Sequence, residues 1–361
     1  MVIVCGENYA QFIVWDGKVW GLGHDKANSL TSKGELSNLP CGVTSISMGN
    51  GHSHYLDDNG CVWSYGTNNY GQLGLGDCNT RIRSRQIETL PKIVSVSASA
   101  TCFASYFSLF LDEDGYVWSC GANEKGELGL GFNGFFTYIK VPQKIPTLAY
   151  IKEIAAACNF SLFLDFDGVV RMAGAIQGME TPTPIKLKQL PKIRTMSAKQ
   201  FQALFLDEEG SVWKMMNDGD FQYYRNQGAT AADIQLFTEI PPISAISCGY
   251  YHILLLDFDG KCWSSGLNYS GELGVGDKLP RPAPIQITEE LPLIQSISAG
   301  YSISYFQDVD GYVWSCGNNG RGQLGHVARE LSSPRKIEIL PPLASATRSL
   351  KTKSARNRIN Y

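Results

Sequence analysis

Two histidines in one expected strand are the first residues of this sequence whose types and spacing suggest chemistry. His52 and His54 form an H-x-H pair, and strand residues two apart point to the same face, as a pair of metal ligands would. A metal site needs at least a third ligand, and the sequence offers none at a plausible position. His252 occupies the position of His52 in a later repeat, so the repeat explains both residues. We therefore predict no metal site and no cofactor.

Acidic turns and glycine-rich loops also resemble sites of known chemistry. The phrases DEDG, DFDG and DVDG look like fragments of calcium loops, but they lack the rest of the twelve-residue pattern and fall at hairpin turns. The GQLGLG-type loops lack the Lys-Ser/Thr and the strand-loop-helix context of a phosphate-binding loop. Neither a G-x-S-x-G motif nor a Ser-His-Asp or Cys-His set can be assigned. We predict no catalytic constellation, hence no enzyme in that sense, and no small-molecule substrate.

Bulk composition narrows the class of protein. The 361 residues are 43% hydrophobic and 18% charged, which is enough apolar material for a packed core. A net charge of −3 argues against nucleic-acid binding by the whole body. We find neither an apolar run of membrane-spanning length nor a signal peptide. The ten cysteines contain no CxxC pair and are interpreted as buried structural thiols of a reducing compartment, so we expect an intracellular protein, cytoplasmic or nuclear.

The elements that position these residues repeat along the chain. A glycine preceded by Asp, Glu or Asn recurs with a mean spacing of about 49 residues, which is typical of a repeat array or propeller. Asp-Gly between two apolar runs predicts a hairpin turn, because such a turn needs positive φ. The seven anchors are Gly17, Gly60, Gly115, Gly168, Gly210, Gly260 and Gly311.

Each unit has the same internal order, with about four short strands and almost no helical periodicity. A small residue and an apolar strand precede the turn, and a Trp, a W-x-x-G glycine, a glycine-rich loop and an LP-x-I phrase follow it. We predict an all-β, seven-bladed β-propeller in one domain over residues 1–346, because four-stranded blades bury their faces only by stacking in a ring. The Trp residues should pack blade against blade; they are Trp20, Trp63, Trp118, Trp213, Trp263 and Trp314. Arg171 takes this position in unit four, which predicts the weakest-packed blade.

The combination DG-x-V-W-x-x-G, G-[QE]-L-G-x-G and LP-x-I resembles the repeat of the regulator of chromosome condensation family. The resemblance covers residues 1–346; units two, three, six and seven match closely, and units one, four and five are degenerate. It implies a propeller that acts by docking, and guanine-nucleotide exchange on a Ran-like small GTPase. The family's exchange factor carries acidic and histidine residues on its loop turns and a wedge-like hairpin. Here the matching slots hold one acid, Glu7, and two histidines, His52 and His252, without a convincing wedge.

The residues that vary while the scaffold repeats suggest a binding face. Turns after the first strand of each blade should gather at one end of the channel, and aromatic residues with Asn, Gln and His on exposed turns fit a protein-binding surface. The alternative is that aromatics in the third slot replace His as buried packing. His252 could add pH sensitivity near its reference pKa. The partner-binding candidates are Glu7, Asn8, Tyr9, Asn50, His52, Tyr106, Asn159, Phe201, Gln202, Tyr250, Tyr251, His252 and Tyr301.

The two chain ends raise separate questions. Residues 347–361 hold five Lys or Arg and no acid, so this flexible basic tail suits nucleic acid, an acidic partner or nuclear import, or is a solvated terminus. Residues 340–349 and the N-terminal MVIVCG both resemble an opening strand and compete for one position in the ring.

The sequence as a whole leaves three candidate functions: a protein-interaction propeller, an exchange factor for a Ran-like GTPase, and a chromatin binder that uses the tail.

Overall fold

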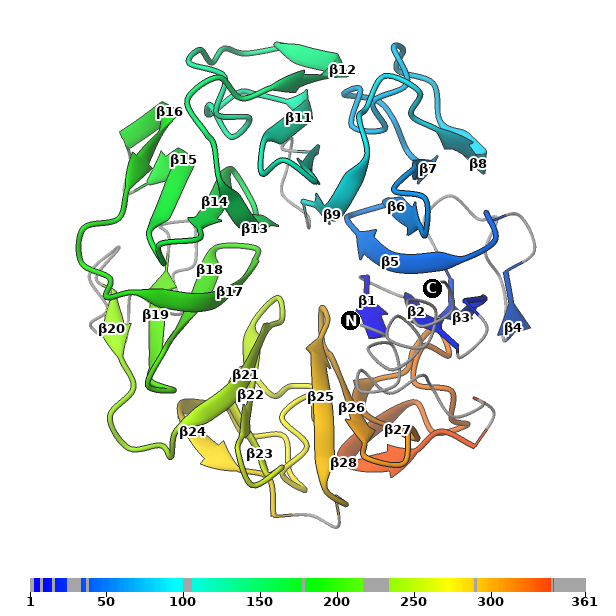
Figure 1. The fold of residues 1–361 in the computed structure, drawn as a ribbon. Helices are drawn as coiled ribbons and strands as arrows, with labels where there is room; N and C mark the ends of the chain where they lie inside the picture. The colour runs from blue at the N-terminus through cyan, green and yellow to red at the C-terminus, as the bar shows by residue number, and fades with distance from the viewer. Residues whose placement is uncertain are drawn as a thin grey trace, which may run out of the picture.

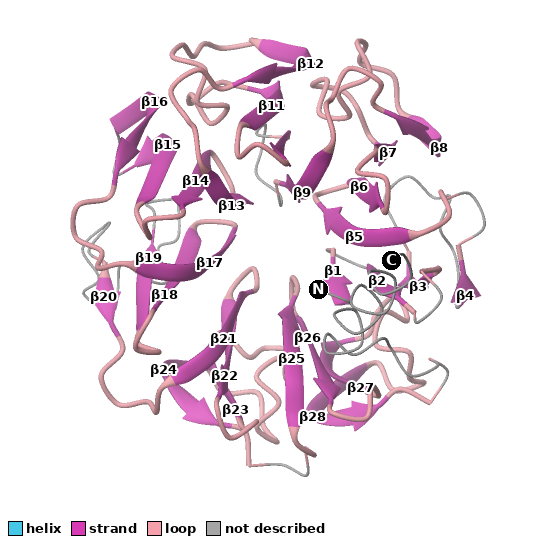
Figure 2. Ribbon diagram, in the orientation of Figure 1, coloured by secondary structure: helices cyan, strands magenta, loops and turns pink. Residues whose placement is uncertain are grey.

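Within the described residues, twenty-eight strands form seven four-stranded antiparallel sheets. Figures 1 and 2 show these sheets arranged in a ring. The structure is a computed structural model of the chain, and it describes residues 3–6, 9–14, 17–24, 34–36, 39–99, 106–176, 179–216, 234–288, 291–338 and 340. Every blade is built from four consecutive strands, so blade one is β1 to β4 and blade seven is β25 to β28. The predicted seven-bladed propeller is confirmed.

The strand bounds follow the repeat closely. In chain order they are β1 (Ile3–Cys5), β2 (Tyr9–Ile13), β3 (Val19–Gly23), β4 (Gly34–Glu35), β5 (Val43–Met48), β6 (His52–Asp57), β7 (Val62–Gly66), β8 (Arg81–Gln86), β9 (Ile93–Ala98), β10 (Phe107–Asp112), β11 (Val117–Ala122), β12 (Tyr138–Lys144), β13 (Ile151–Ala156), β14 (Phe160–Asp165), β15 (Val170–Ile176), β16 (Met179–Lys186), β17 (Ile193–Lys199), β18 (Gln202–Asp207), β19 (Val212–Met216), β20 (Gln235–Leu236), β21 (Ile243–Cys248), β22 (His252–Asp257), β23 (Cys262–Gly266), β24 (Arg281–Gln286), β25 (Ile294–Ala299), β26 (Ile303–Asp308), β27 (Val313–Asn318) and β28 (Glu330–Lys336).

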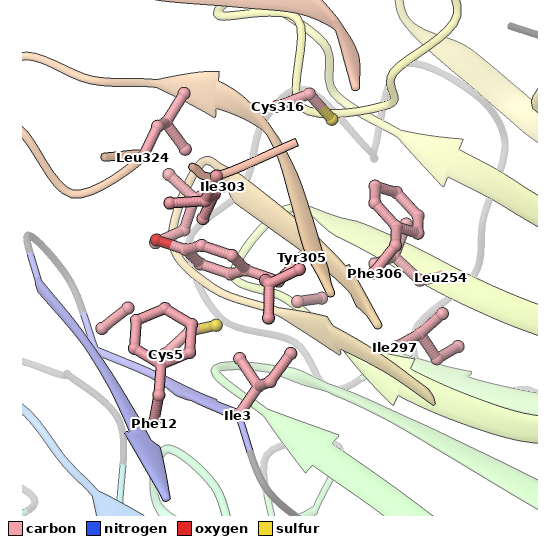
Figure 3. Packing of buried hydrophobic residues seen from close by; sticks show 14 of the residues in the cluster. Ile3, Cys5, Phe12, Leu254, Ile297, Ile303, Tyr305, Phe306, Cys316 and Leu324 are labelled. Atoms are coloured by element: carbon pink, nitrogen blue, oxygen red, sulfur yellow. The ribbon is translucent and has the colours of Figure 1, made fainter. Parts of the chain in front are cut away.

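The ring closes between blades one and seven by side-chain packing. The N-terminal segment supplies β1, the innermost strand of blade one, while residues 341–349, the competing segment, lie outside the described residues. Figure 3 shows Ile3 and Phe12 of blade one facing Tyr305 of blade seven, and the rings of Phe12 and Tyr305 meet edge to face at 5.5 Å. Cys5 Sγ also lies 3.2 Å from Ser298 Oγ across this joint.

The aspartate that ends the second strand of blades two to seven organises the following turn. In blade three, Asp112 Oδ1 accepts hydrogen bonds from the backbone N–H groups of Asp114 and Tyr116, and its Oδ2 accepts one from Trp118 Nε1 at 2.9 Å. The same Trp–Asp bond recurs in blades two, five, six and seven. The tryptophans are half-buried against the interblade core, so they hold the turn as well as pack the blades.

Blade four keeps this contact with a different side chain. Arg171 stands in the Trp position, and its Nη1 donates to Asp165 Oδ2 at 2.6 Å. The ion pair lowers the pKa of Asp165 against the opposing effect of burial. Arg171 therefore retains the contact that holds the turn while losing the ring, and the weaker packing of blade four stays a prediction.

Neighbouring blades are joined by a serine at the channel. Ser47 Oγ of β5 accepts the N–H of Ala98 in β9 at 2.8 Å, and three further joints repeat the bond through Ser97, Ser197 and Ser247. Blade four has Ala155 in this position. Glu153, two residues earlier, takes over: its Oε1 accepts from Thr195 Oγ1 at 3.0 Å and from the Met196 N–H at 3.3 Å. Burial raises the pKa of Glu153 to about 7.

The cysteines fit the expected pattern of buried thiols only in part. Cys5, Cys120, Cys248, Cys262 and Cys316 are buried free thiols within the core. Cys41 is exposed, Cys61 and Cys78 are only half-buried, and Cys158 is disulfide-bonded, so the expectation of a buried free thiol is wrong at these four residues. Within the described ranges, no helix is long and apolar enough to cross a membrane.

Candidate functional site

One end of the ring carries the turns that join the first strand of each blade to its second. The glycine-rich loops lie at the same end, since a Cβ added to Gly66 at the start of such a loop would lie 2.2 Å from the carbonyl oxygen of Gly51 in the turn. We call this end the turn face and the opposite end, where the Asp-Gly turns lie, the DG face. Backbone bonds link adjacent turns, as in Tyr250 N–H to the Gly300 carbonyl at 2.8 Å.

Five of the predicted partner-binding residues are buried. They are Tyr9, Asn50, His52, Gln202 and His252. His252 opens β22 with its ring directed into the joint between blades six and seven, where its Nε2 forms a 2.9 Å hydrogen bond with Ser304 Oγ. Ser304 in turn donates to the carbonyl of Glu272 at 2.6 Å. The alternative of buried packing therefore holds for the histidine slot.

Burial also removes the expected pH response of the histidines. Loss of hydration lowers the pKa of His252 to about 3, and the positive charge of Lys199 lowers it further. Burial lowers the pKa of His52 to about 4. The expectation that His252 titrates near 6.5 is wrong, because a charged imidazole in this joint would be poorly solvated.

The histidine joint also explains the glycine that precedes the turn. At Gly249 an added Cβ would lie 2.6 Å from Cε1 of His252 and 2.8 Å from the carbonyl oxygen of Gly300. The same applies to Gly49 beside His52. Glycine and histidine are therefore one packing unit in these blades. Across the part of the chain that the structure describes, no group of three or more His, Cys, Asp or Glu could hold a metal ion.

Three tyrosines of the predicted face do gather on it. Tyr250 and Tyr251 of blade six and Tyr301 of blade seven are half-buried. Ring centroids are 4.3 Å apart for Tyr250 and Tyr251, and 4.3 Å for Tyr250 and Tyr301. Burial and the neighbouring phenols raise the pKa of Tyr251, so its hydroxyl remains a protonated donor at neutral pH. We call Tyr250, Tyr251 and Tyr301 the first tyrosine cluster.

A second tyrosine cluster joins blades two and three. The ring of Tyr106 stacks on Tyr70 at 5.2 Å, and Tyr138 meets Tyr70 edge to face at 5.0 Å. The sequence predicted Tyr106 and missed the other two. Tyr70 had a signal, since it precedes the repeated G-[QE]-L-G phrase at a position that holds Lys125, Ser270 or Arg321 elsewhere.

An aromatic loop extends this second cluster toward blade four. Phe135 and Phe136 are exposed in residues 131–137, which connect the glycine-rich loop to β12. Lys125 Nζ lies 5.6 Å from the Phe135 ring centroid and pairs with Glu180 of blade four at 2.7 Å. Phe136 has a φ of 62°, a left-handed conformation that costs a bulky residue energy and often marks a functional position.

Two of the remaining predicted residues, Asn159 and Phe201, lie in turns between the first and second strands of blades four and five. Asn159 and Phe201 are half-buried, with Asn159 at a φ of 59°, whereas Glu7 and Asn8 lie outside the described residues. Lys199, which replaces the usual small residue in blade five, reaches across the mouth: its Nζ donates to the carbonyls of Cys5 at 2.8 Å and Ala299 at 3.4 Å. Burial lowers the pKa of Lys199. Its side chain therefore ties blade five to blades one and seven.

Comparison with known proteins identifies the repeat. A family model described as the regulator of chromosome condensation (RCC1) repeat matches residues 59–104, 114–164, 259–306 and 310–347. A second model of the same description matches residues 43–72, 93–127 and 243–272. Together these matches span more than half of the chain.

Relatives and one solved structure extend the similarity over most of the chain. The ultraviolet-B receptor UVR8 of Arabidopsis thaliana is 26% identical over 324 residues, covering 85% of this chain and 72% of the receptor. The guanine nucleotide exchange factor SRM1 of Saccharomyces cerevisiae is 26% identical over 319 residues, covering 73% of this chain and 66% of SRM1. The crystal structure of Prp20p from Saccharomyces cerevisiae aligns with a TM-score of 0.72 at 20% identity, covering 99% of this chain and 96% of that one, which shows the fold.

Proposed function

The chain belongs to the regulator of chromosome condensation repeat family, and from this premise we propose that it binds a protein partner through the aromatic residues of its turn face. The proposal needs no bond-making chemistry, since docking alone is its action. A nuclear or cytoplasmic location remains a prediction.

The observation that carries the proposal is the pair of tyrosine clusters on one face. Tyr250, Tyr251 and Tyr301 come from blades six and seven, and Tyr70 and Tyr106 from blades two and three. None of these rings is fully buried. The fold does not require the ring of Tyr70, since blade six has Ser270 in the same position. Tyrosines supply large contact area at a low entropic cost, which is why they dominate binding interfaces.

A second candidate function is nucleotide exchange on a Ran-like small GTPase. SRM1 is named as a guanine nucleotide exchange factor, and Prp20p is described as having binding properties to Gsp1p and histones. Against it, Glu7 is the one acid among the turn slots, and the two histidines there are buried. A third candidate is chromatin contact through the basic segment 347–361, which is a proposal from sequence alone.

Site-specific cross-linking tests which face binds. We would place the photoreactive residue benzoylphenylalanine at Tyr70 or Tyr269 on the turn face, and at Phe166 on the DG face as the matched control. The same captured protein should appear at both turn-face positions and be missing at the control position. Capture at Phe166 alone would reject the turn face as the docking site.

Release of a labelled nucleotide tests the exchange function separately. Ran loaded with fluorescent GDP would be mixed with the full chain and an excess of GTP. An exchange factor should speed release many-fold, and the Tyr250→Ala/Tyr251→Ala variant should not. Release at the spontaneous rate with the wild-type chain would remove exchange on Ran and leave protein binding as the function.

A further inference from the structure

The DG face carries exposed apolar side chains that the fold does not require. In blades six and seven, Phe258, Leu293 and Val309 are 64%, 59% and 54% exposed. Pro242 is also exposed, and its Cβ would lie 3.0 Å from a Cβ on Gly210 in the turn of blade five. Leu293 lies against the turn of blade six, since its Cδ2 would be 3.3 Å from a Cβ on Gly260, and its carbonyl accepts the N–H of Val309 at 3.1 Å. We call Pro242, Phe258, Leu293 and Val309 the apolar arc.

The repeat provides an internal comparison for the arc. In blade three, Lys92 and Glu113 occupy the positions of Leu293 and Val309, and they form an ion pair at 2.7 Å. The backbone bond between the two positions is the same, with Glu113 N–H to the Lys92 carbonyl at 3.2 Å. Charged residues therefore suit this architecture, so the apolar arc needs another explanation. Contiguous exposed apolar surface usually marks an interaction site.

The charge around the arc favours a basic occupant. Asp259 and Asp310 are exposed immediately next to Phe258 and Val309, and Glu208 and Glu209 are exposed in the corresponding turn of blade five. Four bases surround these turns: exposed Lys192 and Lys261, Lys336, whose Nζ lies 3.4 Å from the Tyr312 ring centroid, and Arg194, whose guanidinium lies 5.9 Å from the Phe258 ring centroid. The turn residues 208–210, 258–260 and 309–311 themselves hold four acids and no base, so a segment with positive charges and a few apolar side chains fits their surface.

The chain itself leaves the described structure beside the arc. Ile337 follows β28, and its N–H donates to the carbonyl of Val313 at 2.8 Å. Val313 begins β27, just after the blade-seven turn that holds Val309. Leu340 is buried in the adjoining core. Residues 341–347 can span about 20 Å when extended. Residues 347–361 follow, with five Lys or Arg, no acid, and the apolar side chains of Leu350, Ile359 and Tyr361.

We propose that residues 347–361 dock on the DG face and cover the apolar arc. The tail holds five of the chain's 31 Lys and Arg, so the remaining residues carry a net charge of −8 against −3 for the whole chain. Attraction between tail and body brings the segment to the acidic turns, and its apolar side chains then contact Phe258 and Val309. The docked tail is unavailable to nucleic acid or to another acidic partner, so the DG face controls whether the tail is free.

A labelled peptide tests the docking. Fluorescein-labelled peptide 347–361 is titrated with the chain truncated after Ala346 and with the full chain, and fluorescence anisotropy reports binding. The truncated chain should bind the peptide. The full chain should bind it more weakly by a factor of roughly ten or more, because its own tail competes for the site at millimolar effective concentration. Raising the salt from 50 to 500 mM should weaken binding. Equal binding to both chains would overturn the proposal.

Matched variants separate the arc from general charge. Phe258→Ser with Val309→Ser, and Asp259→Lys with Asp310→Lys, should each weaken peptide binding to the truncated chain roughly tenfold. Asp58→Lys with Asp114→Lys makes the same charge change in the turns of blades two and three and should have little effect. An equal loss in this control would mean that the tail senses net charge alone, which contradicts docking on the arc.

Cross-linking in the intact chain guards against variants that fail to fold. Benzoylphenylalanine in place of Phe258 should form a link within one molecule to residues 347–361, identified by peptide mass spectrometry. The same residue at Glu113 should form no such link. Links from position 258 only to a second copy or to another protein would overturn the proposal and assign the arc to that partner.

Discussion

Glu153 is the residue where the repeat pattern fails and another side chain takes over. Blade four lacks the channel serine, and Glu153 bonds Thr195 and Met196 of blade five instead. The sequence showed Ala155 in the serine position but carried no sign of the replacement, because the compensating group lies two residues away and acts across a blade boundary. Only the assembled ring brings the two strands together.

Replacing Glu153 with Gln should make stability less dependent on pH. Burial raises the folded-state pKa from 4.5 to about 7, so the stabilisation from this group is fully present below pH 4.5 and is lost as the pH rises through 7. Glu153→Gln keeps an acceptor oxygen without the charge. Between pH 5 and 8, the wild type should lose roughly 2–3 kcal/mol more unfolding free energy than the variant. Urea unfolding measures this; parallel curves for the two proteins would show that Glu153 is solvated.

Trp118→Ala should destabilise the chain by about 2–3 kcal/mol, less than a fully buried aromatic would. The ring is half-buried, and its Nε1 bond to Asp112 is lost together with part of the packing. Trp118→Phe removes the hydrogen bond while keeping most of the ring and should cost about 1 kcal/mol. Thermal or urea unfolding compares the two, and an unchanged midpoint for Trp118→Ala would show that the ring contributes no packing.

The histidine–serine joint is the element that sequence reasoning placed on the wrong side of the turn. His252 follows two turn residues, so its position suggested the surface, but it begins β22 and faces the neighbouring blade. The equivalent Phe107 and Phe160 are also buried. The residue at which the strand begins decides which way this side chain points. If the predicted start of the strand is wrong by one residue, the side chain is assigned to the opposite face. The Asp-Gly turns were predictable because their signal is local.

Ser304→Ala should cost roughly 2 kcal/mol, because it leaves His252 Nε2 buried without its partner and removes the shorter of the two hydrogen bonds to the Glu272 carbonyl. His252→Phe installs the residue that blades three and four use in this position. The double variant should cost less than the sum of the two single changes, as expected for contacting residues. A double-mutant cycle by urea unfolding measures the coupling; strictly additive losses would show that the two side chains act independently.

At the scale of the whole molecule, the ring was predictable and its contacts were not. Seven anchors fixed the number of blades, since each unit repeats one hairpin-rich pattern. Closure was left open between two segments, and β1 fills the position because it continues directly into its partner β2. The boundary at residue 346 lies outside the described residues and stays a prediction. The tyrosine clusters could not be read from one unit, because Tyr70 and Tyr106 come from different blades.

The most direct test of the turn face is a quantitative capture of partners by the purified chain. Tyr250→Ala with Tyr251→Ala removes two rings of the first tyrosine cluster, and Glu113→Ala is the control on the DG face. The double variant should lose its captured partner while its melting temperature falls only slightly, because both rings are half-exposed. Glu113→Ala should capture the partner as the wild type does. Normal capture by a folded double variant, together with loss in Glu113→Ala, would place the binding surface on the opposite face.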